Sequence, residues 1–180
     1  MNTYIVLIRG INVGGKNKIP MSQLKAVLEK QGFSAVSTYI ASGNVILKSK
    51  KKASDVQNEV EKALPKNFKL ESDTVRVLVL DREKLQSIVK NKPRGFGEQP
   101  DTYHSDAIFL IGINATETLP LFKPRDGVDR IWPGDGVIYS ERLSALRTKS
   151  RLNRIMSLPE YQLMTIRNWN TTTKLLEISS

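Results

Sequence analysis

Four segments from the first half of this 180-residue chain recur in the second half in the same order, and this repetition restricts the fold more than any other feature. The clearest pair is IVLIRGINVGGKNKIPM (5–21) and IFLIGINATETLPLF (108–122), which makes Asn12 equivalent to Asn114. Each member reads as an apolar strand, a Gly-Ile-Asn sequence, a polar loop and a helix entered through proline. We therefore expect one folding unit that occurs twice.

Three further pairs keep this order at spacings of 91 to 94 residues: YIASGNVIL (39–47) with IWPGDGVIY (131–139), Leu64-Pro65 with Leu158-Pro159, and TVRVLVLDREKL (74–85) with TIRNWNTTTKLL (165–176). In this alignment Val45 corresponds to Val137, and Arg76 corresponds to Arg167.

In the first unit, alternation and capping patterns predict four strands and three helices. The predicted strands are Tyr4–Ile8, Val36–Ile40, Asn44–Lys48 and Thr74–Leu80, with a tight turn at Ser42-Gly43. The first helix starts near Pro20, the second is capped by Ser54 with Gln57, and the third is capped by Asp81. The resulting order is β-α-β-β-α-β-α.

The second unit gives the same order of elements. Its predicted strands are Ala107–Gly112, Asp129–Trp132, Val137–Glu141 and Met164–Arg167. Ser150 is expected to cap a helix with Leu152, Ile155 and Met156 facing inward, and Thr171 is expected to cap the closing helix.

These patterns predict an α+β protein, a tandem duplication of a ferredoxin-like unit with mainly antiparallel sheets and helices packed on them. The first repeat is expected at residues 1–91 and the second at 92–180, with a polar, turn-rich linker at about 91–105. The two units either lie side by side or fuse their sheets, and the sequence leaves both arrangements open.

The net charge of +10 is unevenly distributed along the chain. Residues 1–91 carry 16 Lys and Arg against 8 Asp and Glu, whereas residues 92–180 carry 12 against 10. A basic excess favours encounters with nucleic acid, anionic lipid or phosphorylated small molecules. A basic excess can also serve only to keep a protein soluble, and from the charge by itself we favour this explanation over a polyanionic partner.

Cysteine is absent and His104 is the single histidine, which removes disulfides, thiolate nucleophiles and cysteine zinc sites. Metal sites built on histidine and Ser-His-Asp sets also lack a second partner, so we expect no metal and no cofactor. Enzymatic activity stays an open question. The apolar run Tyr4–Ile8 is too short to span a bilayer and has no basic leader, so we expect a cytoplasmic protein with no membrane partner.

Three motifs stand out: LIRGINVGG (7–15), YIASGNV (39–45) and TIRNWNT (165–171). Together they resemble the bacterial family catalogued as domain of unknown function 1697, whose pattern is an RGINVGG loop, a Y-x-x-SGNV turn and a terminal T-x-RNW-x-T-x-x-KL segment. The resemblance extends from about Thr3 to Leu176 and implies a double α+β fold with no established activity. Where the family has Ser-Lys-Leu, this chain has Ser150-Arg151-Leu152, so the resemblance implies no lysine-specific chemistry there.

The loop RGINVGGKNK (9–18) is the first candidate site, because it joins a strand to a helix start and combines glycines with cations. The residues that we assign to a ligand here are Arg9, Gly10, Asn12, Gly14, Gly15, Lys16 and Lys18. The loop is neither a Walker loop nor a dinucleotide fingerprint. The alternative, to which we give equal weight, is a long connection that needs glycine for its shape.

Two further segments join this candidate. Ser42 and Asn44 are expected beside the glycine loop, because the first β-α loop and the second hairpin leave the same edge of a ferredoxin-like sheet. In the closing segment, Arg167, Asn168, Trp169 and Thr171 are candidates for gripping an anion or stacking on a planar group. The alternatives are that Asn44 is a turn residue and that Trp169 packs in the core.

The leading hypothesis is a protein that binds a small anionic ligand, phosphorylated or nucleotide-like, through the glycine-rich loop. The first alternative is nucleic-acid binding by the basic first repeat. The second is a structural or interaction protein with no ligand. The sequence does not define an oligomeric state.

Overall fold

The computed structural model describes all residues, 1–180, and contains two compact units. The first consists of Met1–Gln86 with Leu175–Ser180, and the second of Ser87–Lys174. The helices α3 (Arg82–Lys90) and α5 (Trp169–Ile178) each contain residues of both units. The repeat boundary expected between residues 91 and 92 stays a prediction.

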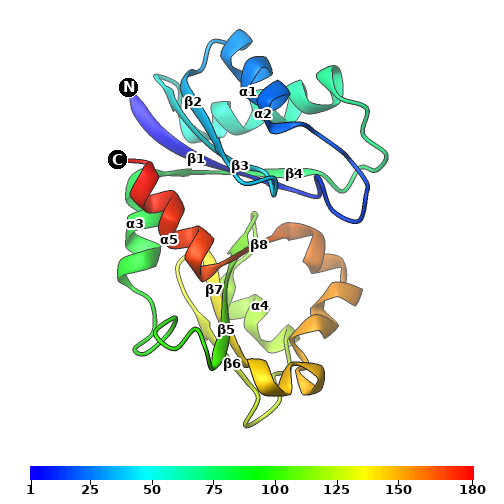
Figure 1. Ribbon diagram of the computed structural model, residues 1–180, viewed down its shortest axis with the longest axis vertical. Coiled ribbons are helices and arrows are strands. Elements are labelled where there is room, and N and C mark those ends of the chain that lie inside the picture. Colours follow the sequence, from blue (N-terminus) through cyan, green and yellow to red (C-terminus); the bar gives the residue numbers. More distant parts are fainter. The chain divides into compact units, whose positions relative to one another are not determined.

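The first unit is a four-stranded sheet covered on one face by two helices (Figure 1). Its strands are β1 (Asn2–Arg9), β2 (Ser34–Tyr39), β3 (Asn44–Ser49) and β4 (Arg76–Asp81), and its helices are α1 (Met21–Lys30) and α2 (Ala53–Asn67). The strand order is β2-β3-β1-β4, and every neighbouring pair is antiparallel. The predicted ferredoxin-like arrangement is therefore confirmed in this unit.

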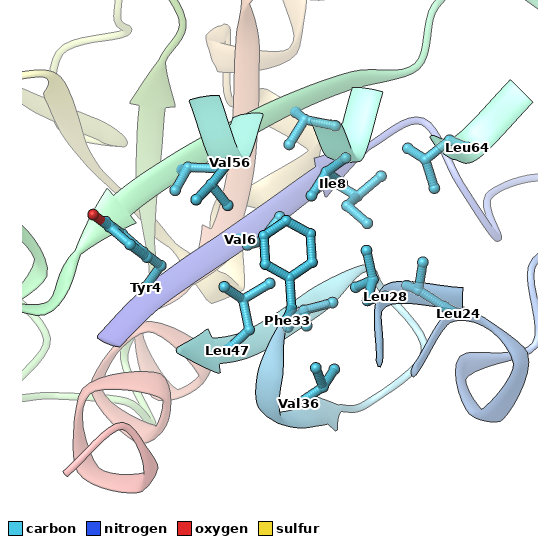
Figure 2. Close-up of a cluster of buried hydrophobic side chains, with 14 of the residues drawn as sticks. Tyr4, Val6, Ile8, Leu24, Leu28, Phe33, Val36, Leu47, Val56 and Leu64 are labelled. Carbon is cyan, nitrogen blue, oxygen red and sulfur yellow. The ribbon is translucent and has the colours of Figure 1, made fainter. Parts of the chain in front are cut away.

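The core of the first unit lies between this sheet and α1 and α2 (Figure 2). Alternate residues of β1, Tyr4, Val6 and Ile8, face the helices, as the twofold period of a strand requires. Leu24 and Leu28 of α1 are fully buried against them. Each such side chain contributes roughly 1.5–3 kcal/mol when it is removed from water.

The second unit repeats this topology with a separate sheet, so the two sheets do not fuse. Its strands are β5 (Tyr103–Leu110), β6 (Asp129–Pro133), β7 (Val137–Leu143) and β8 (Met164–Asn168), in the antiparallel order β6-β7-β5-β8. The duplicated α+β fold is thus confirmed. The first helix of this unit is short: α4 (Ala115–Thr118) is followed by the 3₁₀ turn η1 (Leu119–Leu121).

The helix expected after Ser150 is wrong. The chain after Ser150 forms two 3₁₀ segments, η3 (Leu152–Ser157) and η4 (Pro159–Leu163), and a further one, η2 (Ser144–Lys149), precedes Ser150. Leu158, which precedes Pro159, is extended and separates η3 from η4. Leu152 and Ile155 are buried as expected, but Met156 is 58% exposed.

Of the four predicted helix caps, the one at Asp81 is confirmed, those at Ser54 and Thr171 are wrong, and Ser150 precedes a 3₁₀ segment instead of an α-helix. Asp81 Oδ1 accepts the Lys84 N–H at 2.7 Å, as expected. The second helix starts one residue before Ser54, and Gln57 Oε1 instead accepts the Val79 N–H of β4. At the start of α5 the capping oxygen is Asn168 Oδ1, which accepts the Thr171 N–H at 2.7 Å.

The strand registers correct the sequence alignment of the two halves. Because Asn12 corresponds to Asn114, Leu7 corresponds to Phe109. Leu7 pairs with Asn44 and Phe109 pairs with Val137, so Val137 corresponds to Asn44 and not to Val45. Shifting an alignment by one residue moves every side chain of a strand to the opposite face of the sheet. With the corrected alignment Val45 corresponds to Ile138, and each of these two residues belongs to the hydrophobic core of its own unit.

Arg76 and Arg167 are not equivalent either. In the first sheet Ile5 pairs with Leu80, and in the second Ala107 pairs with Arg167, so Arg167 takes the position of Leu80. The alignment based on the short Thr-x-Arg match is therefore wrong by four positions, the separation of Arg76 from Leu80.

None of the helices, including the 15-residue α2, combines the length and apolar character that crossing a membrane requires.

Candidate functional site

The Arg9–Lys18 loop folds into a small hairpin. The Asn12 N–H donates to the Asn17 carbonyl and the Lys16 N–H to the Val13 carbonyl, both at 3.1 Å. Gly14 and Gly15 occupy the tip with φ of +60° and +74°, and two consecutive positive φ values are typical of a type I′ turn. The two glycines are exposed and serve the shape of the turn.

The Asn12 side chain closes the base of this hairpin. Its Oδ1 accepts the Ile19 N–H at 2.7 Å, and its Nδ2 donates to the Ile19 carbonyl at 2.9 Å and to the Ala41 carbonyl at 2.8 Å. Ala41 belongs to the turn between β2 and β3. The expectation that this turn lies beside the glycine loop is therefore confirmed, and Asn12 fastens the two loops together.

Asn17, which the sequence analysis missed, fastens the hairpin to a third segment. It is 2% exposed, with Nδ2 donating to the Gly10 carbonyl at 2.8 Å and to Ser72 Oγ at 3.0 Å. Its Oδ1 accepts the Glu71 N–H at 2.7 Å. The available signal was an asparagine between two lysines in a glycine-rich loop, since asparagine tolerates the positive φ of 49° found here.

Four cations lie on or next to these segments. Lys16 and Lys18 flank Asn17, both are exposed, and neither makes an ion pair. Arg9 pairs directly with Arg76 across β1 and β4, and its Nη1 donates to the Thr74 carbonyl at 2.9 Å. Glu71 and Asp73 lie on the segment that is bonded to Asn17 and Arg76, so the four cations exceed the two nearby acids by two, and the two lysines are the exposed cations.

Ser42 and Asn44 belong to the packed turn. Asn44 is fully buried, and its Nδ2 donates to the Tyr39 carbonyl at 3.0 Å and to Ser42 Oγ at 2.9 Å. Between them Gly43 accepts the Ile8 N–H at 2.8 Å, and a Cβ there would lie 2.6 Å from the Ile8 carbonyl oxygen. These contacts give the turn its shape and hold it against β1.

The candidates of the closing segment lie in the second unit and are engaged within it. Arg167 is 8% exposed, and its Nη1 donates to Thr165 Oγ1 at 3.0 Å and to the Ile166 carbonyl at 2.9 Å. Burial lowers the pKa of its guanidinium to about 10. Asn168 caps α5, and Thr171 is buried.

Trp169 is part of an aromatic cluster. Its ring is 7% exposed and meets Phe96 edge to face with 5.0 Å between centroids, while Tyr139 lies 6.2 Å away. Gly97 lies against the indole, where any larger residue would collide with it. The indole packs in the core of the second unit, which matches the alternative given for this residue.

A cleft of about 480 Å³ opens in the first unit beside the hairpin. The end of α2, the segment 70–75 and the start of β4 line it with Leu64, Pro65, Leu70, Val75 and Val77. Its polar lining residues are Glu61, Ser72, Asp73 and Arg76. This cleft could not be predicted from the sequence, because a segment without periodicity, residues 70–75, forms one of its walls.

The second unit has a hollow of about 340 Å³ at the position equivalent to the hairpin and its neighbouring turn. The β5–α4 loop, with Gly112 and Asn114, and the β6–β7 turn, with Asp135, line it without any lysine or arginine. The cationic character of this end of the sheet is therefore specific to the first unit.

The comparisons with known proteins agree with this fold. The model of the DUF1697 family, described as a protein of unknown function, matches residues 1–139. The solved structure of the conserved bacterial protein SP0830 from Streptococcus pneumoniae is similar over 99% of both chains, with a TM-score of 0.81 and 23% sequence identity. At this identity the likeness shows the fold alone. No curated protein matches the chain.

Proposed function

We propose a function from the site itself, because this chain belongs to the DUF1697 family, whose description assigns none. The function is the binding of a small anionic ligand, phosphorylated or nucleotide-like, by the hairpin of residues 9–18. The ligand contacts are the ammonium groups of Lys16 and Lys18, with the exposed backbone of Gly14 and Gly15 between the loop strands.

One observation carries this proposal: two exposed lysines without ion-pair partners stand on a loop whose base is fixed by buried hydrogen bonds. Ordering a loop before binding reduces the entropy that association costs. Asn12 and Asn17 supply this order, so we assign them to positioning the loop. Asn44, Arg167 and Trp169 make internal contacts, and the proposal does not use them as ligand groups.

The test is a thermal-shift screen of phosphorylated metabolites and inorganic phosphate. A ligand present at 100 times its Kd stabilises the folded state by about 2.7 kcal/mol, which the melting temperature reports readily. We expect at least one stabilising compound, and we expect the double variant Lys16→Ala, Lys18→Ala to lose that response.

The matched control is the double variant Lys50→Ala, Lys52→Ala, which removes the same charge from two other exposed lysines of the first unit. It should keep the response. If both double variants weaken binding equally, net charge and not the hairpin is responsible, and the proposed site is wrong.

Repeating the assay with a single-stranded oligonucleotide at several salt concentrations tests the nucleic-acid alternative. A polyanion that contacts several lysines binds with an affinity that falls steeply as salt rises, whereas a single phosphate group gives a shallow dependence. As part of this proposal we place the protein in the cytoplasm, whose reducing conditions agree with a chain that has no cysteine.

A further inference from the structure

We infer that the ligand is an amphiphile: the hairpin lysines hold its single anionic head, and the cleft beside them takes an uncharged apolar body. This inference rests on the proposed function and names the chemical class of the ligand at that same site. It concerns residues to which neither the family description nor the similar structure assigns a role.

The hairpin and the cleft are joined through one side chain. Asn17 stands between Lys16 and Lys18, and its Nδ2 donates to the hydroxyl of Ser72 at 3.0 Å. Ser72 lines the cleft, and its hydroxyl also hydrogen-bonds with that of Thr74 at 2.8 Å. The Asn17 side chain therefore touches the wall of the cleft, and the inference places the ammonium groups of its two neighbours at the mouth of the cleft.

The interior of the cleft suits hydrocarbon. Leu70 and Val75 are half-buried and Pro65 is exposed, so these three side chains form the apolar surface that a ligand can contact. A volume of about 480 Å³ lies within the usual range of pockets for small molecules. Removing an apolar body from water against these side chains supplies affinity that two exposed lysines alone do not provide.

The charged residues of the cleft restrict the ligand further. Glu61 and Asp73 line it, and acidic side chains disfavour a second anionic group on the body of the ligand. Arg76, the one cation of the lining, donates from Nη1 to the carbonyls of Asp73 and Val75 and so holds the segment that forms the wall. These residues favour one anionic head on an uncharged body over a compact polyanion.

The experiment is a calorimetric titration with inorganic phosphate and with n-alkyl phosphates from ethyl to octyl, kept below the concentrations at which they form micelles. Affinity should rise by up to about fourfold per methylene, the ratio that corresponds to about 0.8 kcal/mol per buried methylene. Leu70→Ser and Pro65→Ala should flatten this dependence on chain length, and both should leave the affinity for inorganic phosphate unchanged.

The matched control is Leu121→Ser, the same change at a half-buried leucine of the second unit, which should leave the chain-length series unchanged. If the Leu70→Ser variant does not fold, the chain-length series of Pro65→Ala, a change at an exposed residue of the cleft lining, is compared with that of the unmodified protein instead. A rise with chain length that neither cleft variant alters would overturn the inference.

Two other results separate this inference from the proposed function. If phosphate binds through Lys16 and Lys18 with an affinity that does not depend on chain length, the cleft has no role and only the proposed function stands. If neither phosphate nor any alkyl phosphate binds, both fail. Binding to vesicles of phosphatidylcholine and phosphatidic acid without binding to the monomeric alkyl phosphates also overturns the inference, because the inference specifies a single amphiphile that enters the cleft.

Discussion

Replacing Asn12 by alanine should destabilise the protein far more than the same replacement at Asn114, its equivalent in the second unit. The Asn12 side chain makes three hydrogen bonds of 2.7 to 2.9 Å, each with a net contribution of about 1 kcal/mol. Its φ of 54° adds about 1 kcal/mol for a residue such as alanine. The expected loss is about 4 kcal/mol.

Asn114 provides the internal comparison. Its Oδ1 accepts the N–H groups of Thr116 and Glu117 at the start of α4, and its own φ of −94° suits alanine. Loss of an N-cap of this kind costs about 1 kcal/mol. Asn12→Gly removes the hydrogen bonds without the backbone strain, so its loss should be about 3 kcal/mol and should fall between the two alanine variants.

The assay is unfolding in urea followed by far-ultraviolet circular dichroism together with tryptophan fluorescence, because a chain with two units need not unfold in one step. Both tryptophans, Trp132 and Trp169, lie in the second unit, so fluorescence reports on that unit alone. Equal losses of about 1 kcal/mol for Asn12→Ala and Asn114→Ala would refute the assignment of Asn12 as the residue that closes the hairpin.

Three further outcomes are expected from substitutions elsewhere. Gly43→Ala should cost about 2 kcal/mol more in urea denaturation than Gly32→Ala, since both have positive φ but only the Cβ at Gly43 meets the Ile8 carbonyl, and equal losses would contradict this. Burial raises the pKa of Tyr139, whose hydroxyl donates to the Ile88 carbonyl at 2.7 Å, to about 12. Tyr139 therefore stabilises the folded state fully below its ordinary pKa of 10, and this stabilisation is lost as the pH rises towards 12. Tyr139→Phe should lower the free energy of unfolding by about 1 kcal/mol at neutral pH. The variant should also lose less stability than the unmodified protein between pH 10 and 12, which urea midpoints at several pH values will show. Burial also raises the pKa of Asp106, against the opposing effect of His104 at 3.0 Å, so its contribution to stability falls as the pH rises from its ordinary value of 3.8 through the raised one. Asp106→Asn should therefore gain stability relative to the unmodified protein as the pH rises above 3.8, and a relative loss would contradict the direction of the shift.

The duplicated fold could be predicted because each unit contains strong local signals that agree with its topology. The apolar run of β1, the spacing of Leu24 and Leu28, and the cap at Asp81 each specify an element whose neighbours are set by short connections. Right-handed crossovers then leave few arrangements for a β-α-β-β-α-β string.

The sequence predictions were wrong where similar residues at two positions suggested an equivalence or a role that strand register or packing assigns to another residue. The alignment of Val45 with Val137 followed similar residues, but strand pairing is decided by which face is buried, and this moved the match by one position. Thr171 resembles a cap by type, yet Asn168 stands three residues before the N–H that needs an acceptor.

The contact between the hairpin and its neighbouring turn was predicted from the sequence, the side-chain contacts that hold them together were not, and the ligand site itself stays a prediction. The glycines and lysines of the hairpin and its neighbouring turn could be read from the sequence, whereas the roles of Asn12 and Asn17 depend on carbonyls and N–H groups as far away as Ala41 and Glu71. The cleft depends on the path of the segment 70–75, which no periodic pattern specifies.

The most direct test of the account is a titration of uniformly ¹⁵N-labelled protein with inorganic phosphate, followed through the backbone amide resonances. The account predicts saturable shifts concentrated at Gly14, Gly15, Lys16 and Lys18, with the amides of the second-unit counterpart around Asn114 unchanged. Saturable shifts centred on any other segment, or no saturable shift at the hairpin, would contradict it.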